Sequence, residues 1–126
     1  MFLPVMTIGD PRIDWAVAHI DNNLDRPLRI GEIARAVNLS TSRFTRLFRE
    51  ATGDSPARYL QVRRLERARI LIETTFFTIK EVMVKVGFND PSHFTRYFSR
   101  HHGVSPTGIR ASRGRRQTHG REPGAQ

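Results

Sequence analysis

The chain has 126 residues, enough for one domain or two very small ones. Its apolar share of 38% and charged share of 26% are typical of a folded chain with a modest core and exclude a fully disordered one. The formal net charge is +9, and every cation except Lys80 and Lys85 is an arginine. Because arginine binds phosphate and guanine with paired hydrogen bonds, a nucleic acid is the favoured partner over an anionic membrane.

The absence of several residue patterns narrows the function further. There is no cysteine, which excludes disulfides, cysteine zinc sites and thiol catalysis and fits a reducing, cytoplasmic compartment. No apolar run approaches the roughly 20 residues that a membrane span needs. The apolar start of the chain, residues 1–6, is too short and lacks the basic flank of a signal peptide. No catalytic triad order, phosphate-binding glycine loop or metal-ligand spacing is found, so we expect no enzyme, metal or cofactor.

Cap and stop residues indicate short helices throughout the middle of the chain. Four prolines follow a residue that can cap a helix N-terminus: Asp10, Ser55, Asp90 and Ser105. Thr78 and Glu81 have the spacing of a capping box. Three glycines follow periodic segments: Gly53, Gly87 and Gly103. No stretch alternates with the period of a strand, so the sequence predicts an all-α fold of about seven helices.

Composition divides the chain into three segments. Residues 1–9 form a short apolar lead or the remnant of a linker, and residues 10–111 carry the helical periodicity. Residues 112–126 have no apolar residue except Ala125, and they hold four arginines. We expect this last segment to be a disordered basic tail.

An internal repeat lies within the periodic segment. Residues 44–56 (FTRLFREATGDSP) and 94–106 (FTRYFSRHHGVSP) are identical at seven of thirteen positions. Upstream, residues 30–39 resemble residues 79–88. Each copy has the pattern of a helix, a tight turn and a second helix, which is a helix-turn-helix unit. One such pattern often binds nothing, but two copies on a strongly basic chain favour DNA.

Helical periodicity assigns a buried face to each copy. In the first copy the expected core residues are Ile30, Ile33, Ala34, Val37, Phe44, Leu47, Phe48 and Ala51. In the second they are Ile79, Val82, Met83, Val86, Phe94, Tyr97 and Phe98, with His101 at the edge. Trp15 and the pair Phe76–Phe77 are also expected in core positions.

The face opposite the buried one is polar in both second helices. It carries Ser42, Thr45, Arg46 and Arg49 in the first copy, and Ser92, Thr95, Arg96 and Ser99 in the second, with His93 and Arg100 at its edge. A major groove admits a helix with short hydrogen-bonding side chains and arginines. Ser40 and Asp90 start these helices, whose first-turn amides can bind phosphate.

The second copy contains a specific signature: Ile79, Glu81, Val86-Gly87-Phe88, Asp90, Ser92, Phe94, Arg96, Phe98, Gly103, Ser105-Pro106 and Arg110. With these residues, the chain resembles the DNA-binding domain of AraC/XylS-type bacterial transcription regulators from about Pro11 to Arg110. The resemblance implies two helix-turn-helix subdomains joined by one long helix. The implied parts are a first unit at 10–54, a linker helix at 55–74 and a second unit at 75–111. Apolar contacts to both halves would come from Leu60, Leu65, Ala68, Leu71 and Ile72.

The resemblance also implies roles for individual residues. Base-reading residues would be Ser42, Thr45, Arg46, Ser92, His93 and Arg96. Phosphate contacts would be Ser40, Arg43, Arg49, Thr95, Ser99 and Arg100. The implied partner is double-stranded DNA, bound by a monomer or weak dimer, with RNA polymerase as a second partner of an activator. Non-specific, charge-driven binding is the alternative, as is a fragment of a larger effector-responsive regulator.

Two positions depart from the family pattern. Met83 stands where the family usually has alanine, as Ala34 does in the first copy, so the second helix pair must repack around a larger side chain. Arg29 stands where a serine or threonine cap is usual, so the helix after it is expected to fray.

Overall fold

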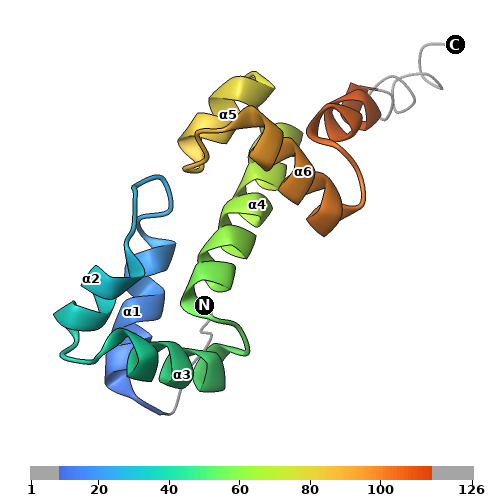
Figure 1. The fold of residues 1–126 in the computed structure, drawn as a ribbon. Coiled ribbons are helices and arrows are strands. Elements are labelled where there is room, and N and C mark those ends of the chain that lie inside the picture. Colours follow the sequence, from blue (N-terminus) through green and yellow to red (C-terminus); the bar gives the residue numbers. More distant parts are fainter. Residues whose placement is uncertain (1–8, 115–126) are drawn as a thin grey trace, which may run out of the picture. The chain divides into compact units, whose positions relative to one another are not determined.

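The computed structural model describes residues 9–114, so the N-terminal lead up to residue 8 and the tail from residue 115 lie outside the described residues. The labelled helices are α1 (Pro11–Asp21), α2 (Ile30–Ala36), α3 (Thr41–Thr52), α4 (Pro56–Thr74), α5 (Ile79–Lys85) and α6 (Pro91–His102) (Figure 1). A seventh helical segment begins at residue 106 and continues to residue 114. Residues 9–114 contain no strand, which confirms the all-α prediction. No helix between residues 9 and 114 has the length and apolar character to cross a membrane.

The chain divides into two compact units, a first unit (Met1–Arg64) and a second unit (Leu65–Gln126), and the division falls within α4. The buried core of the first unit consists of Ile13, Ala16, Val17, Ile20, Leu24, Ile33, Ala34, Val37, Phe44, Phe48 and Leu60. The buried core of the second consists of Leu65, Ala68, Ile72, Val82, Met83, Val86, Phe94, Phe98 and Ile109. As expected, α4 supplies apolar side chains to both cores, and each unit has a core of its own.

The helix-turn-helix repeat is also visible in the backbone. In the first unit the N–H of Leu39 donates to the carbonyl of Ala34 at 2.9 Å, and in the second the N–H of Phe88 donates to the carbonyl of Met83 at 3.0 Å. The residue just before each donor has a positive φ: Asn38 at 61° and Gly87 at 99°. Asparagine and glycine are the residues that most readily adopt this conformation, so both turns end their first helix in the same way.

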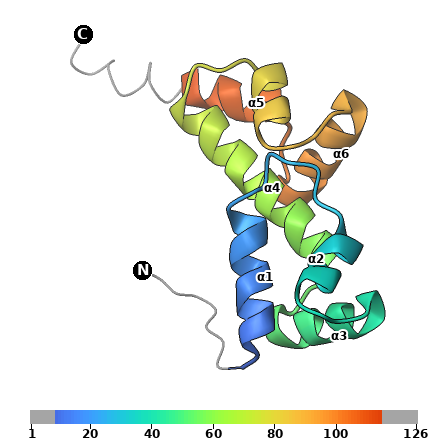
Figure 2. The same ribbon diagram turned by 90° about the vertical axis from the view of Figure 1, so that its left-hand side faces the viewer.

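Within the first unit, α3 lies across the end of α1 and next to α2 (Figures 1 and 2). The start of α4 is tied to α1 by polar contacts at Asp21. This carboxylate accepts hydrogen bonds from the Tyr59 hydroxyl at 3.2 Å and from Arg63 Nε at 3.1 Å. Arg64 Nε also donates to the Leu24 carbonyl at 2.8 Å. These contacts hold α4 against α1. Because α3 packs against α1 and α2, one of its faces is buried and the other is exposed.

Side-chain caps fix where the helices start. Each expected cap side chain accepts a hydrogen bond from a backbone N–H group. These side chains are Asp10, Ser40, Ser55, Thr78, Asp90 and Ser105. Thr78 and Glu81 form the expected capping box. Arg29 makes no side-chain cap, yet α2 still begins at Ile30, because the N–H groups of Glu32 and Ile33 both donate to the Arg29 carbonyl. The local sequence signals therefore place the helices accurately.

The Asp90 cap is expected to make the stability of α6 depend on pH. The His93 N–H, helped by the positive charges of His93 and Arg96, holds the pKa of Asp90 below its usual value. A lowered carboxyl pKa gives a stabilisation that is complete above the ordinary pKa of about 3.9 and is lost as the pH falls through the lowered value. We expect Asp90→Asn, which keeps a capping side chain without the charge, to remove this part of the acid dependence. Thermal melts of both proteins across the acidic range measure it, and parallel curves would contradict it.

Three residues that the sequence predicted to be in the core are exposed. Trp15 is 46% exposed and stacks on His19, with ring centroids 4.8 Å apart. Phe76 is 90% exposed and lies under the guanidinium of Arg113, 4.9 Å from its ring centroid, whereas Phe77 is half-buried against the second core. Ala51 is exposed because it lies in the last turn of α3, where no neighbouring element covers it.

The histidine at the edge of the second core is His102, not His101. His101 is exposed, whereas the half-buried His102 ring lies 4.4 Å from the Phe98 ring and its Nε2 donates to the Leu65 carbonyl at 3.0 Å. Burial lowers the pKa of His102, and the charges of His101 and Arg69 add to this effect. The Nε2–H that the Leu65 carbonyl requires is present in one neutral tautomer, so the contact does not depend on a charged ring.

The final helical segment is attached to the end of α4 by two arginines. Arg110 donates to the carbonyls of Ile72 at 3.3 Å and Phe77 at 2.8 Å. Arg113 donates to the carbonyls of Ile72 and Thr75. This helix continues to residue 114. Residues 112–114, which were expected to belong to the disordered tail, are therefore helical. A helix ends with carbonyls that lack intrahelical partners, and these side chains supply the donors.

We expect Arg110→Ala to destabilise the second unit by about 1.5 kcal/mol, the lower end for hydrogen bonds from charged donors, because the guanidinium is only half-buried. The replacement removes the donor to the Phe77 carbonyl and one of the two arginine donors to the Ile72 carbonyl. Urea unfolding measures the change in stability. Arg110→Lys should recover only part of the lost stability, since an ammonium group lacks the planar set of donors that a guanidinium offers to two carbonyls. An unchanged midpoint for Arg110→Ala would contradict the proposed role.

Candidate nucleic-acid interface

The outer face of α3 carries the side chains that the sequence assigns to DNA. Phe44 and Phe48 are 0% exposed, and these two anchors on one side of α3 fix its rotation. The opposite side consequently exposes Ser42, Arg43, Arg46 and Arg49, with Thr45 half-exposed. The Ser40 hydroxyl accepts the Arg43 N–H at 3.2 Å, so one of the first-turn amides is already used by the cap. The remaining surface is cationic and rich in short hydroxyl side chains.

The outer face of α6 is built in the same way. Phe94 and Phe98 are buried at the positions that correspond to Phe44 and Phe48. Exposed on the opposite side are Ser92, His93, Thr95, Arg96 and Arg100, whereas Ser99 is half-buried. The structure therefore brings the expected side chains of each unit onto one face of one helix.

The N-terminus of α6 differs from that of α3 because its cap is an acid. Asp90 accepts the His93 N–H at 3.0 Å, and its other carboxylate oxygen lies 4.0 Å from His93 Nδ1. The His93 ring also lies 5.9 Å from the ring of Tyr97. A carboxylate at this end competes with a phosphate for the first-turn amides. Phosphate binding at this helix start is therefore less favourable than at α3, whose cap is the neutral Ser40.

The arginines expected to read bases have different neighbours. Arg46 Nη1 lies 3.7 Å from Glu50 Oε2, one turn further along α3. The guanidinium of Arg96 lies over the Tyr97 ring, 5.6 Å from its centroid. Glu50 lies outside the four positions opposite the core and is therefore absent from the predicted site, although its spacing of four residues from Arg46 is a recognisable ion-pair signal.

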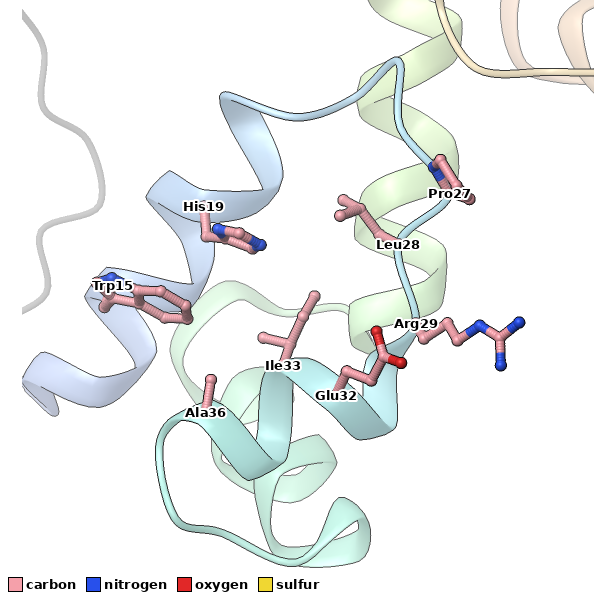
Figure 3. A pocket seen from close by; sticks show the side chains of 8 residues that line it. All are labelled: Trp15, His19, Pro27, Leu28, Arg29, Glu32, Ile33 and Ala36. Atoms are coloured by element: carbon pink, nitrogen blue, oxygen red, sulfur yellow. The ribbon is translucent and has the colours of Figure 1, made fainter.

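Each unit also contains a small pocket. In the first unit a pocket of about 160 Å³ is lined by Trp15, His19, Pro27, Leu28, Arg29, Glu32, Ile33 and Ala36, with the two stacked rings forming one wall (Figure 3). In the second unit a pocket of about 220 Å³ lies between α5 and α6, and its lining includes Met83 and Thr95. Met83 is only 5% exposed, so the larger side chain is accommodated within the core rather than expelled.

Comparison with known proteins identifies the family. Residues 33–112 match a family model described as a helix-turn-helix domain. The chain is 36% identical over 103 residues to the arabinose operon regulatory protein of Escherichia coli (strain K12), covering 81% of this chain and 35% of that protein. It spans about a third of the length of such curated relatives.

Solved structures agree with this assignment. One is a transcriptional regulator from Chromobacterium violaceum with an AraC-type DNA-binding domain, 32% identical with a TM-score of 0.74, covering 82% of this chain and 92% of that chain. Another is the DNA-binding domain of AdpA, a global transcriptional factor, in complex with a target DNA. It is 30% identical with a TM-score of 0.78, covering 91% of this chain and 98% of that chain. The chain therefore belongs to the AraC/XylS family of bacterial transcription regulators.

Proposed function

We propose that this chain binds DNA in a sequence-specific manner as a transcription regulator, with α3 and α6 each entering a segment of the major groove. The observation that carries the proposal is that two separately cored units expose the same kind of face on the second helix of a helix-turn-helix. A B-form major groove is wide enough to admit such a helix. The likeness to the DNA-bound AdpA domain supports DNA as the partner. The role is one of binding rather than catalysis, in the bacterial cytoplasm.

The proposed contacts follow the exposed faces. Base edges are read by Ser42, Thr45 and Arg46 from α3 and by Ser92, His93 and Arg96 from α6. Phosphates are contacted by Ser40, Arg43, Arg49, Thr95, Ser99 and Arg100. Arginine can donate two hydrogen bonds to guanine O6 and N7, whereas serine and threonine can bond to any base. Arg46 and Arg96 therefore carry most of the discrimination between bases.

The two recognition helices are proposed to read successive major-groove segments on one side of the DNA. Such segments are about one helical turn apart, on the order of 10 bp. A monomer with two readers needs no partner subunit to recognise both elements. Because the chain spans about a third of its curated relatives, the same domain also fits the DNA-binding part of a larger effector-responsive regulator. An activator of this type would also contact RNA polymerase.

The net charge of +9 favours a second candidate, non-specific binding to any nucleic acid. Selection from a pool of randomised duplexes at near-physiological salt separates the two. We expect enrichment of two short elements about 10 bp apart. Bound DNA without an enriched motif, together with a steep salt dependence, would instead establish charge-driven binding and overturn the assignment of base-reading residues. Failure to retain any DNA would overturn both candidates.

A further inference from the structure

The two recognition helices differ at the position next to the arginine that is proposed to read bases. With the repeat offset of 50, Arg46 corresponds to Arg96, and Glu50 corresponds to Arg100. Arg46 and Glu50 form an ion pair at 3.7 Å. Within residues 9–114, Arg96 has no such pair and instead lies over the ring of Tyr97. The first reading arginine therefore has a carboxylate beside it, and the second has an aromatic ring.

This difference is one of placement more than of total charge. The α3 face has three arginines, Arg43, Arg46 and Arg49, and the acid Glu50, which sum to +2. The α6 face has Arg96 and Arg100, and the acidic cap Asp90 brings the sum to +1 with neutral histidines. Long-range attraction to DNA is consequently somewhat greater for α3, by one unit of charge, although α3 carries the acid beside its arginine. What separates them is the immediate electrostatic surrounding of the reading arginine.

Glu50 is poorly placed for both helix stability and DNA affinity. It lies in the last turn of α3 (Thr41–Thr52), where the negative end of the helix dipole disfavours an anion. The order of arginine before glutamate is also the weaker orientation for an ion pair four residues apart. A carboxylate beside a surface that binds phosphates repels DNA. The favourable contact that Glu50 makes is the one with Arg46.

We propose that Glu50 is a positioning residue that makes Arg46 selective for guanine. A DNA phosphate must compete with Glu50 for the guanidinium, so a non-specific contact replaces one charge pair with another and gains little. A guanine edge adds two directed hydrogen bonds from the major groove, which the carboxylate does not duplicate. Glu50 thus lowers affinity for non-target DNA more than affinity for target DNA. This inference rests on the proposed function, because it assumes that α3 reads base edges.

The test compares variants on two duplexes: the one enriched by the unaltered chain, and a scrambled duplex of the same composition. Glu50→Gln removes the charge but keeps the shape of a side chain that is 62% exposed, so the core is not disturbed. Glu73→Gln is the matched control. Glu73 forms the same kind of pair with Arg69, four residues earlier on α4 at 3.0 Å, and its replacement changes the net charge equally. Arg100→Glu places an acid at the equivalent position of α6.

We expect Glu50→Gln to bind the scrambled duplex about two- to fivefold more tightly, the range that one exposed ion pair allows. Affinity for the enriched duplex should rise less, so the ratio between the two falls. In selections with this variant, base preference should weaken in the first element only. Glu73→Gln should leave the ratio unchanged. Arg100→Glu should weaken binding to the scrambled duplex more than binding to the enriched one, which raises the ratio.

Two results would overturn the inference. An unchanged ratio for Glu50→Gln would show that the carboxylate does not influence how Arg46 reads DNA. A loss of affinity for the enriched duplex alone would show that Glu50 contacts a base itself, for example the amino group of cytosine. The control Arg46→Ala separates failure of this inference from failure of the proposed function. If Arg46→Ala does not weaken base preference in the first element, the assignment of α3 as a reader fails.

Discussion

Arg96→Ala is expected to lower the discrimination between bases in the second DNA element by about 1–3 kcal/mol, and Arg46→Ala to do the same in the first. Each replacement removes a guanidinium that is exposed on the outer face of its helix, opposite two buried phenylalanines. The affinity for duplexes altered in one element, measured by equilibrium binding, reports this effect. Because the two arginines lie in different units, their losses should be additive to within about 0.5 kcal/mol.

The control is a cation of equal charge on a different helix. Arg67 is exposed on α4, and Arg67→Ala changes the net charge by the same amount. We expect it to leave the preference between bases unchanged. The salt dependence of binding gives a second criterion. An arginine that only touches phosphate would weaken binding to all sequences equally and reduce the salt slope by about one, and this result would contradict base reading.

Phe98→Ala is expected to destabilise the second unit by about 3–5 kcal/mol, and Phe48→Ala to destabilise the first by a similar amount. Both side chains are fully buried, and each packs against a second phenylalanine one turn away with ring centroids 5.6 Å apart. Small domains have a total stability of only about 5–15 kcal/mol, so such a loss is sufficient to unfold much of one unit.

Amide hydrogen exchange tests whether the destabilisation by each replacement is confined to the unit that carries it. Phe48 and Phe98 belong to separate buried clusters, so Phe98→Ala should remove protection from α5 and α6 while α1 and α3 remain protected. Phe98→Leu is the matched control and should retain most of the stability, because it leaves a smaller cavity. Simultaneous loss of protection in both units would contradict the independence of the two cores.

The sequence predicted helix starts well because caps are local. The side chain of Asp90 and the N–H that it accepts are only three residues apart, so the pattern can be read without knowing the fold. The buried faces of the recognition helices were equally predictable, because a period of 3.6 residues places Phe44 and Phe48 on one side. The family followed from the repeat and its signature.

The features that the sequence did not predict depend on distant neighbours. Periodicity places Trp15 on an apolar stripe but does not say where the covering helix ends, and the ring is left partly exposed beside His19. Composition alone places Arg113 in a disordered tail, yet its hydrogen-bond partner at Ile72 lies 41 residues earlier in the chain. The charge on such an arginine looks the same in the sequence whether it meets solvent, phosphate or the end of a helix.

The partly exposed Trp15 has a practical consequence for measuring this protein. It is the single tryptophan of the chain, and it lines the pocket of the first unit together with Ile33 and His19. Its fluorescence emission therefore follows the first unit alone, whereas far-ultraviolet circular dichroism follows the helices of both. One urea titration recorded with both signals would separate the unfolding of the first helix-turn-helix from that of the second, without any label or engineered residue.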